Sequence, residues 1–305
     1  MKSSQFLRAL VLGILGALFF SFTFIFNRSM NVTGGFWGWS ASLRYVLSLP
    51  ILWFLVKRKQ GLSAVGASIS RNPWQWLLWS TIGFGFFYAP LTLASLYGQS
   101  WFIAATWQIT IVAGVLLSPL FGQKLPLKQL GLSLVVLLGV FVLQLPYLSQ
   151  GLGHHLFLAL TLILIAAFSY PLGNRKMLHL THSQDLSTLQ RVFGMTLMSL
   201  PFWLALSLYS GLSVGLPPVS QLMQSLIVAL FSGVIATLLF FEATNLVKHH
   251  HKQLAIIEAT QSGEVVFTLL GGCLFLGDAW PNAIGFLGLA LIILGMLLNS
   301  LFANK

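Results

Sequence analysis

Acidic residues are nearly missing from this chain. Only five of its 305 residues are Asp or Glu, and charged residues of both signs make up 7% of the sequence, whereas hydrophobic residues make up 57%. A water-soluble domain carries roughly a quarter charged residues to cover its surface, while a protein solvated by lipid needs few. The composition therefore excludes a soluble globular protein and predicts an integral membrane protein.

The few charges are strongly unbalanced, with 16 Lys and Arg residues and a formal net charge of +11. In a soluble domain this excess would favour nucleic acid as a partner. Here the basic residues fall almost entirely in the short connections between apolar runs. That placement is typical of residues that orient a membrane protein, so we expect no nucleic-acid partner.

Other kinds of chemistry lack their residues as well. Cys273 is the single cysteine, which excludes an intramolecular disulfide. No glycine-rich phosphate loop is present, so ATP-driven transport would need a separate subunit. The run His249-His250-His251 resembles a metal site, but consecutive residues on a helix point about 100° apart and cannot converge on one ion. Since no nucleophile and base stand out either, we expect no cofactor, no metal and no enzymatic activity.

Long apolar runs dominate what is present. A spanning helix needs about 20 mostly apolar residues, and glycine and proline pairs separate such runs along this chain. The first run is too long for the apolar core of a signal peptide, about 7 to 15 residues, so we expect it to be retained. The sequence predicts an all-α membrane protein with ten transmembrane helices, at residues 8–26, 37–56, 75–95, 101–121, 127–147, 154–172, 187–208, 223–245, 254–276 and 280–302.

The positions of Lys and Arg predict the orientation of these spans. Positive residues near helix ends are retained on the cytoplasmic side, and they occur at the amino terminus and in the connections after spans 2, 4, 6 and 8. The connections after spans 3, 5, 7 and 9 contain none, and the connection after span 1 contains only Arg28. We therefore expect a multi-pass protein of the inner (plasma) membrane with both termini in the cytoplasm.

The ten predicted spans divide into two halves, residues 1–150 and 151–305, whose motifs match in order. The matching pairs are Asn27-Arg28 with Asn174-Arg175, Arg44 with Arg191, Ser48-Leu49-Pro50 with Ser199-Leu200-Pro201, Ala105-Thr106-Trp107-Gln108 with Ala259-Thr260-Gln261, and Leu130-Gly131-Leu132 with Leu287-Gly288-Leu289. Halves of five spans necessarily point in opposite directions. The pattern therefore predicts two inverted five-helix repeats that enclose a site near the bilayer midplane.

These features resemble the drug/metabolite transporter (EamA-like) superfamily. The resemblance covers nearly the whole chain and includes the closing stretches "LFGQKLPLKQLGLSLVVLLGV" and "LFLGDAWPNAIGFLGLALIILGM". The segment "LAIIEATQSGEVVFTLLGG" is similar to the branch of multidrug resistance efflux transporters. The resemblance implies a secondary transporter whose relatives export amino acids, nucleotides, sugars or drugs. Four-helix relatives use a Glu in their first helix, whereas no acid precedes Asp185 here.

Acids inside predicted spans are the main candidates for the site. A charged side chain at the bilayer centre costs upwards of about 2.5 kcal/mol, so it is normally retained for pairing, proton relay or substrate contact. In span 9, Glu264 lies roughly 9 Å deeper than Glu258, with Gln261 midway between them, so all three could border one cavity. Glu264 is the candidate proton-titratable carboxylate, and the alternative is a structural ion pair with Arg191 or Arg44.

The remaining acids have simpler expected roles. Glu242, near the cytoplasmic end of span 8, could approach Glu258 or pair with Lys248 or Lys252. Asp185 and Asp278 fall in connections, where we expect solvated or capping roles.

Arginines and aromatic residues leave the substrate class open between two alternatives. Arg44 and Arg191 could tie their helices to backbone carbonyls or clamp an anionic group. In span 4, Trp107 lies between Thr106 and Gln108, and its ring could stack on a flat or cationic substrate or simply pack. Lining arginines favour anionic metabolites, whereas glutamates and aromatics favour cations.

The sequence as a whole predicts an exporter of lipophilic or cationic compounds that works by proton antiport and alternating access. Its partners would be the substrate, protons and the lipid bilayer, and the chain would be a monomer or homodimer. The alternative is an exporter or exchanger of amino acids or other small metabolites with the same fold. An intramembrane enzyme or a sensor would need a nucleophile, a metal cluster or a soluble output domain, and the sequence contains none of these.

Overall fold

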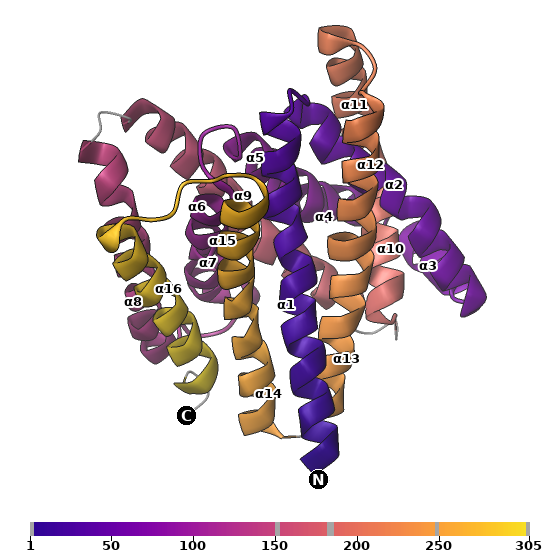
Figure 1. The fold of residues 1–305 in the computed structure, drawn as a ribbon. Helices are drawn as coiled ribbons and strands as arrows, with labels where there is room; N and C mark the ends of the chain where they lie inside the picture. Colours follow the sequence, from indigo (N-terminus) through magenta and orange to yellow (C-terminus); the bar gives the residue numbers. More distant parts are fainter. Residues whose placement is uncertain (1–2, 150–152, 182–185, 248–249, 303–305) are drawn as a thin grey trace.

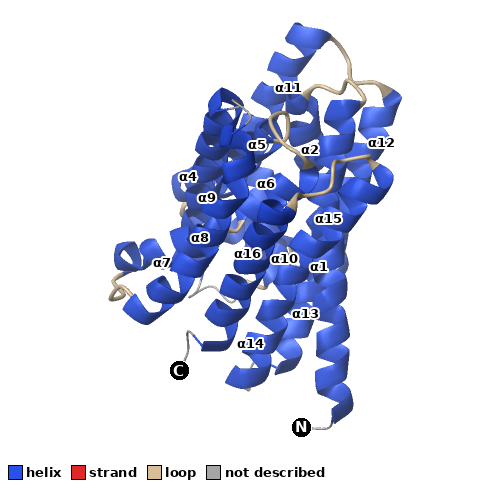
Figure 2. Cartoon of the chain, turned by 60° about the vertical axis from the view of Figure 1, so that its left-hand side comes forward, coloured by secondary structure: helices blue, strands red, loops and turns tan. Residues whose placement is uncertain are grey.

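Apolar helices account for nearly all of the computed structural model, which describes residues 3–149, 153–181, 186–247 and 250–302. These ranges contain no β-strand (Figure 2). Up to residue 149 the helices are α1 (Ser3–Val32), α2 (Trp37–Arg58), α3 (Leu62–Arg71), α4 (Pro73–Ser80), the π-helix η1 (Thr81–Gly85), α5 (Phe86–Ala94), α6 (Ser100–Trp107), α7 (Ile109–Leu116), the 3-10 helix η2 (Ser118–Phe121) and α8 (Leu127–Ser149).

The described helices after residue 152 continue the same pattern. They are α9 (Gly153–Thr181), α10 (Thr188–Met198), α11 (Leu200–Val214), α12 (Val219–Val228), the π-helix η4 (Ala229–Ala236), α13 (Thr237–Val247), α14 (His251–Ala259), the 3-10 helix η5 (Thr260–Ser262), α15 (Gly263–Phe275) and α16 (Ala283–Phe302).

Helix ends follow local sequence signals. Pro73 occupies the first turn of α4, where its missing N–H would have no partner anyway. Ser187 and Gln190 form a capping box at the start of α10, each side chain bonding to the other's backbone N–H. Gly122 and Gly277 follow η2 and α15 with φ of 72° and 69°, a left-handed conformation that glycine adopts without steric cost.

Seven helical stretches in the described ranges are long and apolar enough to cross a membrane, and the bent pair α10 and α11 would make an eighth. The protein is therefore a multi-pass membrane protein. Each of the ten predicted ranges coincides with a helical stretch. Two of them are not among these spans. The helical stretch of α6 and α7 covers only Ser100–Leu116, and η5 separates α14 from α15.

Interruptions occur at corresponding places in the two halves of the chain. In predicted span 4 the helix breaks at Gln108, and in predicted span 9 it tightens to a 3-10 turn at η5. Both breaks fall on the matched Ala-Thr motifs. Predicted spans 3 and 8 each contain a π-helix, η1 and η4. Such irregular turns loosen the backbone ladder and are frequent at functional sites.

The helices α8 and α16 form a closely packed pair along one side of the bundle (Figure 1). Gly139 and Gly288 let their backbones approach. A Cβ at Gly139 would lie 2.7 Å from the backbone N of Ile292, and one at Gly288 would lie 2.8 Å from the backbone N of Leu143. In lipid, where apolar burial gives no driving force between helices, such close backbone contact is a main source of helix association.

Both ends of the chain lie at the same end of the bundle (Figure 1). The end of α13 and the start of α14 lie there too, whereas the loop between α15 and α16 lies at the opposite end of these helices. In the same view, α1 stands between the α12–α13 and α14–α15 columns and contacts both. α1 is therefore the central helix around which the site is arranged.

Replacing Gly139 by Ala is expected to destabilise the protein by about 1–3 kcal/mol, because the added methyl group overpacks the backbone of α16. Gly131→Ala on the same helix is the control, because nothing lies within 4 Å of its Cβ position, and it should be neutral or slightly stabilising. Denaturant unfolding in detergent micelles, followed by tryptophan fluorescence, measures both effects. Equal effects of the two substitutions would contradict the close packing.

Candidate functional site

Arg44 is a buried cation in the interior of the bundle, with 9% of its surface exposed. Its guanidinium nitrogens donate to the hydroxyl oxygens of Thr23 on α1 and Ser232 on η4, both at 3.2 Å. Its Cζ lies 4.1 Å from the centroid of the Tyr88 ring. Among the described residues no carboxylate oxygen lies within 4.0 Å of the guanidinium. Neutral hydroxyls and an aromatic ring therefore satisfy this charge.

Aromatic side chains hold the surroundings of Arg44 in place. The Tyr88 hydroxyl donates to Asn27 Oδ1 at 3.1 Å. Tyr45, the neighbour of Arg44, stacks on Trp203 of α11 with ring centroids 4.4 Å apart and planes 7° apart. These contacts join α1, α2, α5 and α11 around one guanidinium. Such a network specifies a single arrangement because each member depends on the others.

Glu264 lies in the first turn of α15, directly after the break at η5. Its side chain is half-buried. The Gln108 side chain, at the corresponding break, is a polar neighbour of the carboxylate, and its Nε2 donates to the Ala104 carbonyl oxygen at 3.1 Å. Arg44 interacts with the carboxylate electrostatically. No Lys or Arg nitrogen of the described residues lies within 4.0 Å of the carboxylate. The alternative of a direct ion pair with Arg44 or Arg191 therefore does not form in this structure.

Span 4 brings two of its three predicted residues to Glu264 and directs the third elsewhere. The ring of Trp107 packs on Phe87 at 5.0 Å and on Tyr170 at 5.8 Å between centroids, and Tyr170 also interacts electrostatically with Glu264. Thr106 instead faces α8, where it accepts a hydrogen bond of 3.3 Å from Gln144 Nε2. Gln108 and Trp107 thus border the region around Glu264, and Thr106 belongs to a separate buried contact.

Gln144 is a polar residue that our reasoning from the sequence did not single out. It is 4% exposed and its Oε1 has no hydrogen-bond partner among the described residues. The sequence signal was present, since Gln144 is an isolated amide in the apolar run of predicted span 5. A buried acceptor without a partner is costly unless it is used.

Three further predicted residues lie on predicted spans 8 and 9. Glu258 is exposed on α14, and Gln261 is half-buried with its Nε2 unpaired among the described residues. Glu242 pairs with Arg8 at 3.7 Å, and both side chains are largely exposed, so the pair contributes little. Lys248 lies outside the described residues, as do Asp185, His249 and the side chain of Lys252.

A groove of about 640 Å³ is lined in part by Glu242, which pairs with Arg8 near the start of α1. Residues of α2, α10, η4 and α13 line it, with Lys59 and Glu242 among mainly apolar side chains. Arg191 of α10 is half-buried and has no carboxylate within 4.0 Å among the described residues. The two matched arginines therefore differ, because only Arg44 is held by a buried network.

Asp278 is the acid whose position departs most from its expected solvated place in a loop. It is 7% exposed. Its Oδ2 accepts from the Ser100 backbone N–H at 2.9 Å and from Ser100 Oγ at 2.6 Å, and its Oδ1 lies 3.4 Å from Arg28 Nε. The expected capping role is correct, but the capped helix is α6, far away in the sequence.

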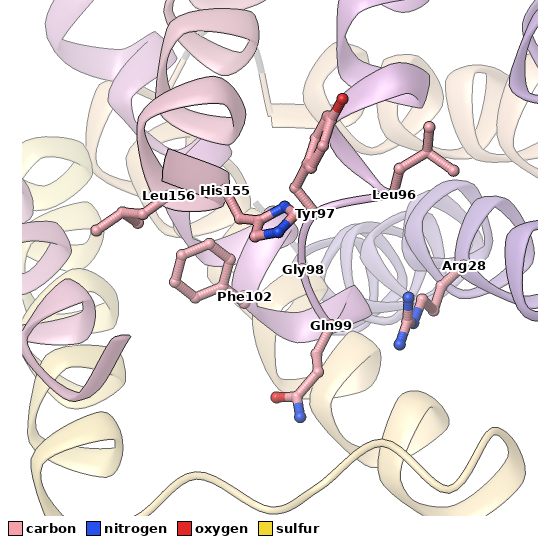
Figure 3. Close-up of a pocket in the computed structure, with 8 residues that line it drawn as sticks. All are labelled: Arg28, Leu96, Tyr97, Gly98, Gln99, Phe102, His155 and Leu156. Atoms are coloured by element: carbon pink, nitrogen blue, oxygen red, sulfur yellow. The ribbon is translucent and has the colours of Figure 1, made fainter. Parts of the chain in front are cut away.

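A cavity of about 260 Å³ lies next to this ion pair (Figure 3). Arg28, Gln99 and Phe102 line it together with His155 of α9, whose ring lies 5.8 Å from that of Tyr97. In Figure 3 the loop that follows α15 passes below Gln99 and Arg28. Charged and aromatic groups from α1, α6 and α9 thus surround one opening at this end of the bundle.

Comparison with known proteins identifies the family. The family model EmrE, described as "Putative multidrug resistance efflux transporter", matches residues 7–305. The chain is 48% identical to "Uncharacterized protein YjlA" of Bacillus subtilis (strain 168), over 98% of this chain and 96% of that protein. It is 45% identical to "Uncharacterized 42.1 kDa protein in intracellular alkaline protease 3'region" of Shouchella clausii, over 88% and 73%. A crystal structure with 14% identity superposes with a TM-score of 0.62 over 97% of both chains, which shows the fold alone.

Arg44→Gln is expected to lower the free energy of unfolding by about 1.5–3 kcal/mol, because the hydrogen bonds of a buried charged group are lost. The matched variant Arg191→Gln should lower it by less than about 1 kcal/mol, since no buried network holds that side chain. Unfolding in detergent micelles, followed by tryptophan fluorescence, compares the two. Equal losses would show that the network around Arg44 contributes nothing particular.

Proposed function

This chain belongs to the family of multidrug resistance efflux transporters, within the drug/metabolite transporter superfamily, and from that premise we propose its substrate and mechanism. The proposed activity is export of lipophilic or cationic organic compounds across the inner membrane in exchange for protons. The site alternates between the two sides of the membrane. Small-molecule transport follows from the family, and the cationic class and proton coupling are our proposals.

The proposal rests mainly on the Glu264 carboxylate. It lies inside the bundle, and no Lys or Arg side chain of the described residues forms an ion pair with it. A structural ion pair would neutralise it permanently, whereas an unpaired carboxylate can bind either a proton or a cationic group. Gln108 supplies a polar neighbour, and the rings of Trp107 and Tyr170 supply faces that attract cations. A cationic substrate and a proton would therefore compete for the same group, which is the requirement for exchange.

The arrangement of breaks supports the proposed inverted repeat of ten spans. The third and fourth predicted spans of each half are irregular at matching places, η1 with η4 and Gln108 with η5. The start of α1 and the end of α16 lie at the same end of the bundle, which is consistent with an even number of membrane crossings. The proposed halves, residues 1–150 and 151–305, meet at residues 150–152, outside the described ranges.

A second candidate function is export or exchange of amino acids or other small metabolites by the same fold. Arg44 favours it, because its guanidinium interacts with the Glu264 carboxylate and so lies near the same space. An anionic group bound there would be attracted by Arg44. The two candidates differ in which charge the substrate must carry.

Replacing Glu264 by Gln is expected to abolish proton release on substrate binding and to reduce proton-driven export of cationic dyes at least about 100-fold, because the neutral amide neither exchanges a proton nor attracts a cation. Purified protein screened with cationic dyes and amino acids in weakly buffered detergent solution measures the release. Proteoliposomes with an imposed pH gradient measure the export.

Glu258→Gln is the matched control, since it removes an exposed carboxylate from the same helical column. We expect it to retain proton release. Release that persists in Glu264→Gln and disappears in Glu258→Gln would move the coupling site to Glu258. Amino-acid transport that continues in Glu264→Gln would favour the metabolite candidate.

The proposed topology predicts that Ser70 and Ser213 lie on opposite sides of the membrane. Both are exposed in the structure, and a Ser→Cys replacement is nearly isosteric. In a Cys273→Ser background, an impermeant maleimide added to intact cells should label Ser213→Cys, and Ser70→Cys should be labelled only after permeabilisation. Labelling of both from the outside would contradict the ten-span arrangement.

A further inference from the structure

We propose that Asp278 closes one end of the transporter by joining the two halves of the chain, and that the opposite end has no equivalent buried carboxylate among the described residues. The inference rests on the proposed alternating access. It assigns a gating role to Asp278, Arg28 and Ser100, called the latch below. Asp278 belongs to the second half of the chain, and Arg28 and Ser100 belong to the first half.

The geometry of the latch carries the proposal. The Asp278 carboxylate receives two hydrogen bonds from Ser100, at 2.9 and 2.6 Å, where α6 begins. A carboxylate at a helix amino terminus is stabilised both by the free N–H groups and by the helix dipole. Its second oxygen faces Arg28 near the end of α1. One side chain therefore connects the loop after α15 to two helices of the other half.

Neighbouring contacts also join the two halves of the chain at this place. Trp101 Nε1 donates to the Ala279 carbonyl oxygen at 3.1 Å, next to the latch. Gly272 of α15 leaves room for the latch, because a Cβ there would lie 2.7 Å from Asp278 Oδ2 and would clash with Ser100 Oγ. Only glycine permits this approach. The latch therefore depends on backbone shape as well as on charge.

The equivalent position in the other half lacks the carboxylate. Gly122-Gln123 after η2 matches Gly277-Asp278 after α15, and both glycines adopt the same left-handed conformation. Gln123 is exposed. Arg175, the counterpart of Arg28, donates to the Gly114 carbonyl oxygen at 2.6 Å instead of facing an acid. The two ends of the protein therefore share a backbone conformation but differ in the polar contacts that join the halves.

This difference determines which conformational state the transporter occupies before substrate binds. Opening the Asp278 end requires the separation of a buried carboxylate from its hydrogen-bond donors and from Arg28. At the other end the described contacts of charged groups between the halves include the bond from Arg175 to a backbone carbonyl and the exposed Arg8–Glu242 pair, which contributes little. The state closed at Asp278 is therefore favoured before substrate binds. The cavity lined by Arg28 gives water a place next to the pair (Figure 3).

Cys273, the chain's single cysteine, is a native reporter for the latch. It directly follows Gly272 on α15, is half-buried, and lies close enough to Asp278 to interact with it electrostatically. We expect Asp278→Asn to increase the alkylation rate of Cys273 by an impermeant maleimide about tenfold, because loss of the charge releases the seam. Gly272→Ala should act in the same direction without a change of charge.

Lys128→Gln, an exposed charge change at the start of α8, is the control and should leave the rate unchanged. All variants are compared as monodisperse purified protein, and Gly272→Ala decides if Asp278→Asn fails to fold. Unchanged rates in the folded latch variants would overturn the proposal.

Gln123→Glu tests the one-sidedness of the latch. A carboxylate there can reach for Arg175 and fasten the other end, so Cys273 alkylation should again become faster in a protein whose own latch is intact. No change would overturn the claim that the missing charge matters.

The labelling readout requires no substrate. Faster labelling of the latch variants in a protein that exports nothing would support the latch and refute the proposed function. If labelling is unaltered in a protein whose export depends on Glu264, the proposed function is supported and the latch is refuted.

Discussion

The absence of hydrogen-bonding partners in the hydrocarbon part of a bilayer is the constraint on which the rest of this structure depends. Polar groups inside the bundle must be satisfied by the protein itself. Arg44 is held by hydroxyls of Thr23 and Ser232, which are 209 residues apart in the chain and bond to each other at 2.5 Å. Asp278 likewise binds Ser100 across 178 residues. The few polar residues therefore join segments that are far apart in the sequence.

The spans and their irregular points could be predicted from the sequence to different degrees. Apolar runs located the helical stretches of all ten predicted spans, because length and hydropathy suffice for that. They did not predict α3, which lies in the connection between predicted spans 2 and 3. The matched motifs marked where predicted spans 4 and 9 break, although nothing in "ATWQ" specifies a break, since it contains neither proline nor glycine. Irregularity at Gln108 depends on packing against other helices, and reasoning along one segment does not include those neighbours.

The rotation of each helix about its axis was much harder to predict. Gln108 neighbours Glu264 and Trp107 packs on Tyr170 beside it, whereas Thr106 turns towards Gln144. Helices that are apolar all round carry no stripe that identifies an inner face. The same difficulty applied to Asp278, whose partners Ser100 and Arg28 lie in distant parts of the sequence. Arg44 and Arg191 show that matched positions in a repeat share a backbone place and need not share a chemical environment.

The glycine seam between α8 and α16 has a consequence for biosynthesis. α16 emerges from the ribosome only after α9 to α15, so the face of α8 that it covers stays open to lipid or chaperones through that interval. Lipid is a poor substitute for a backbone packed within 3 Å of Cβ positions. Assembly of the bundle therefore ends with its most extensive helix contact. A ribosome that stalls before α16 leaves a membrane-inserted intermediate with α8 uncovered, which is a substrate for quality-control proteases.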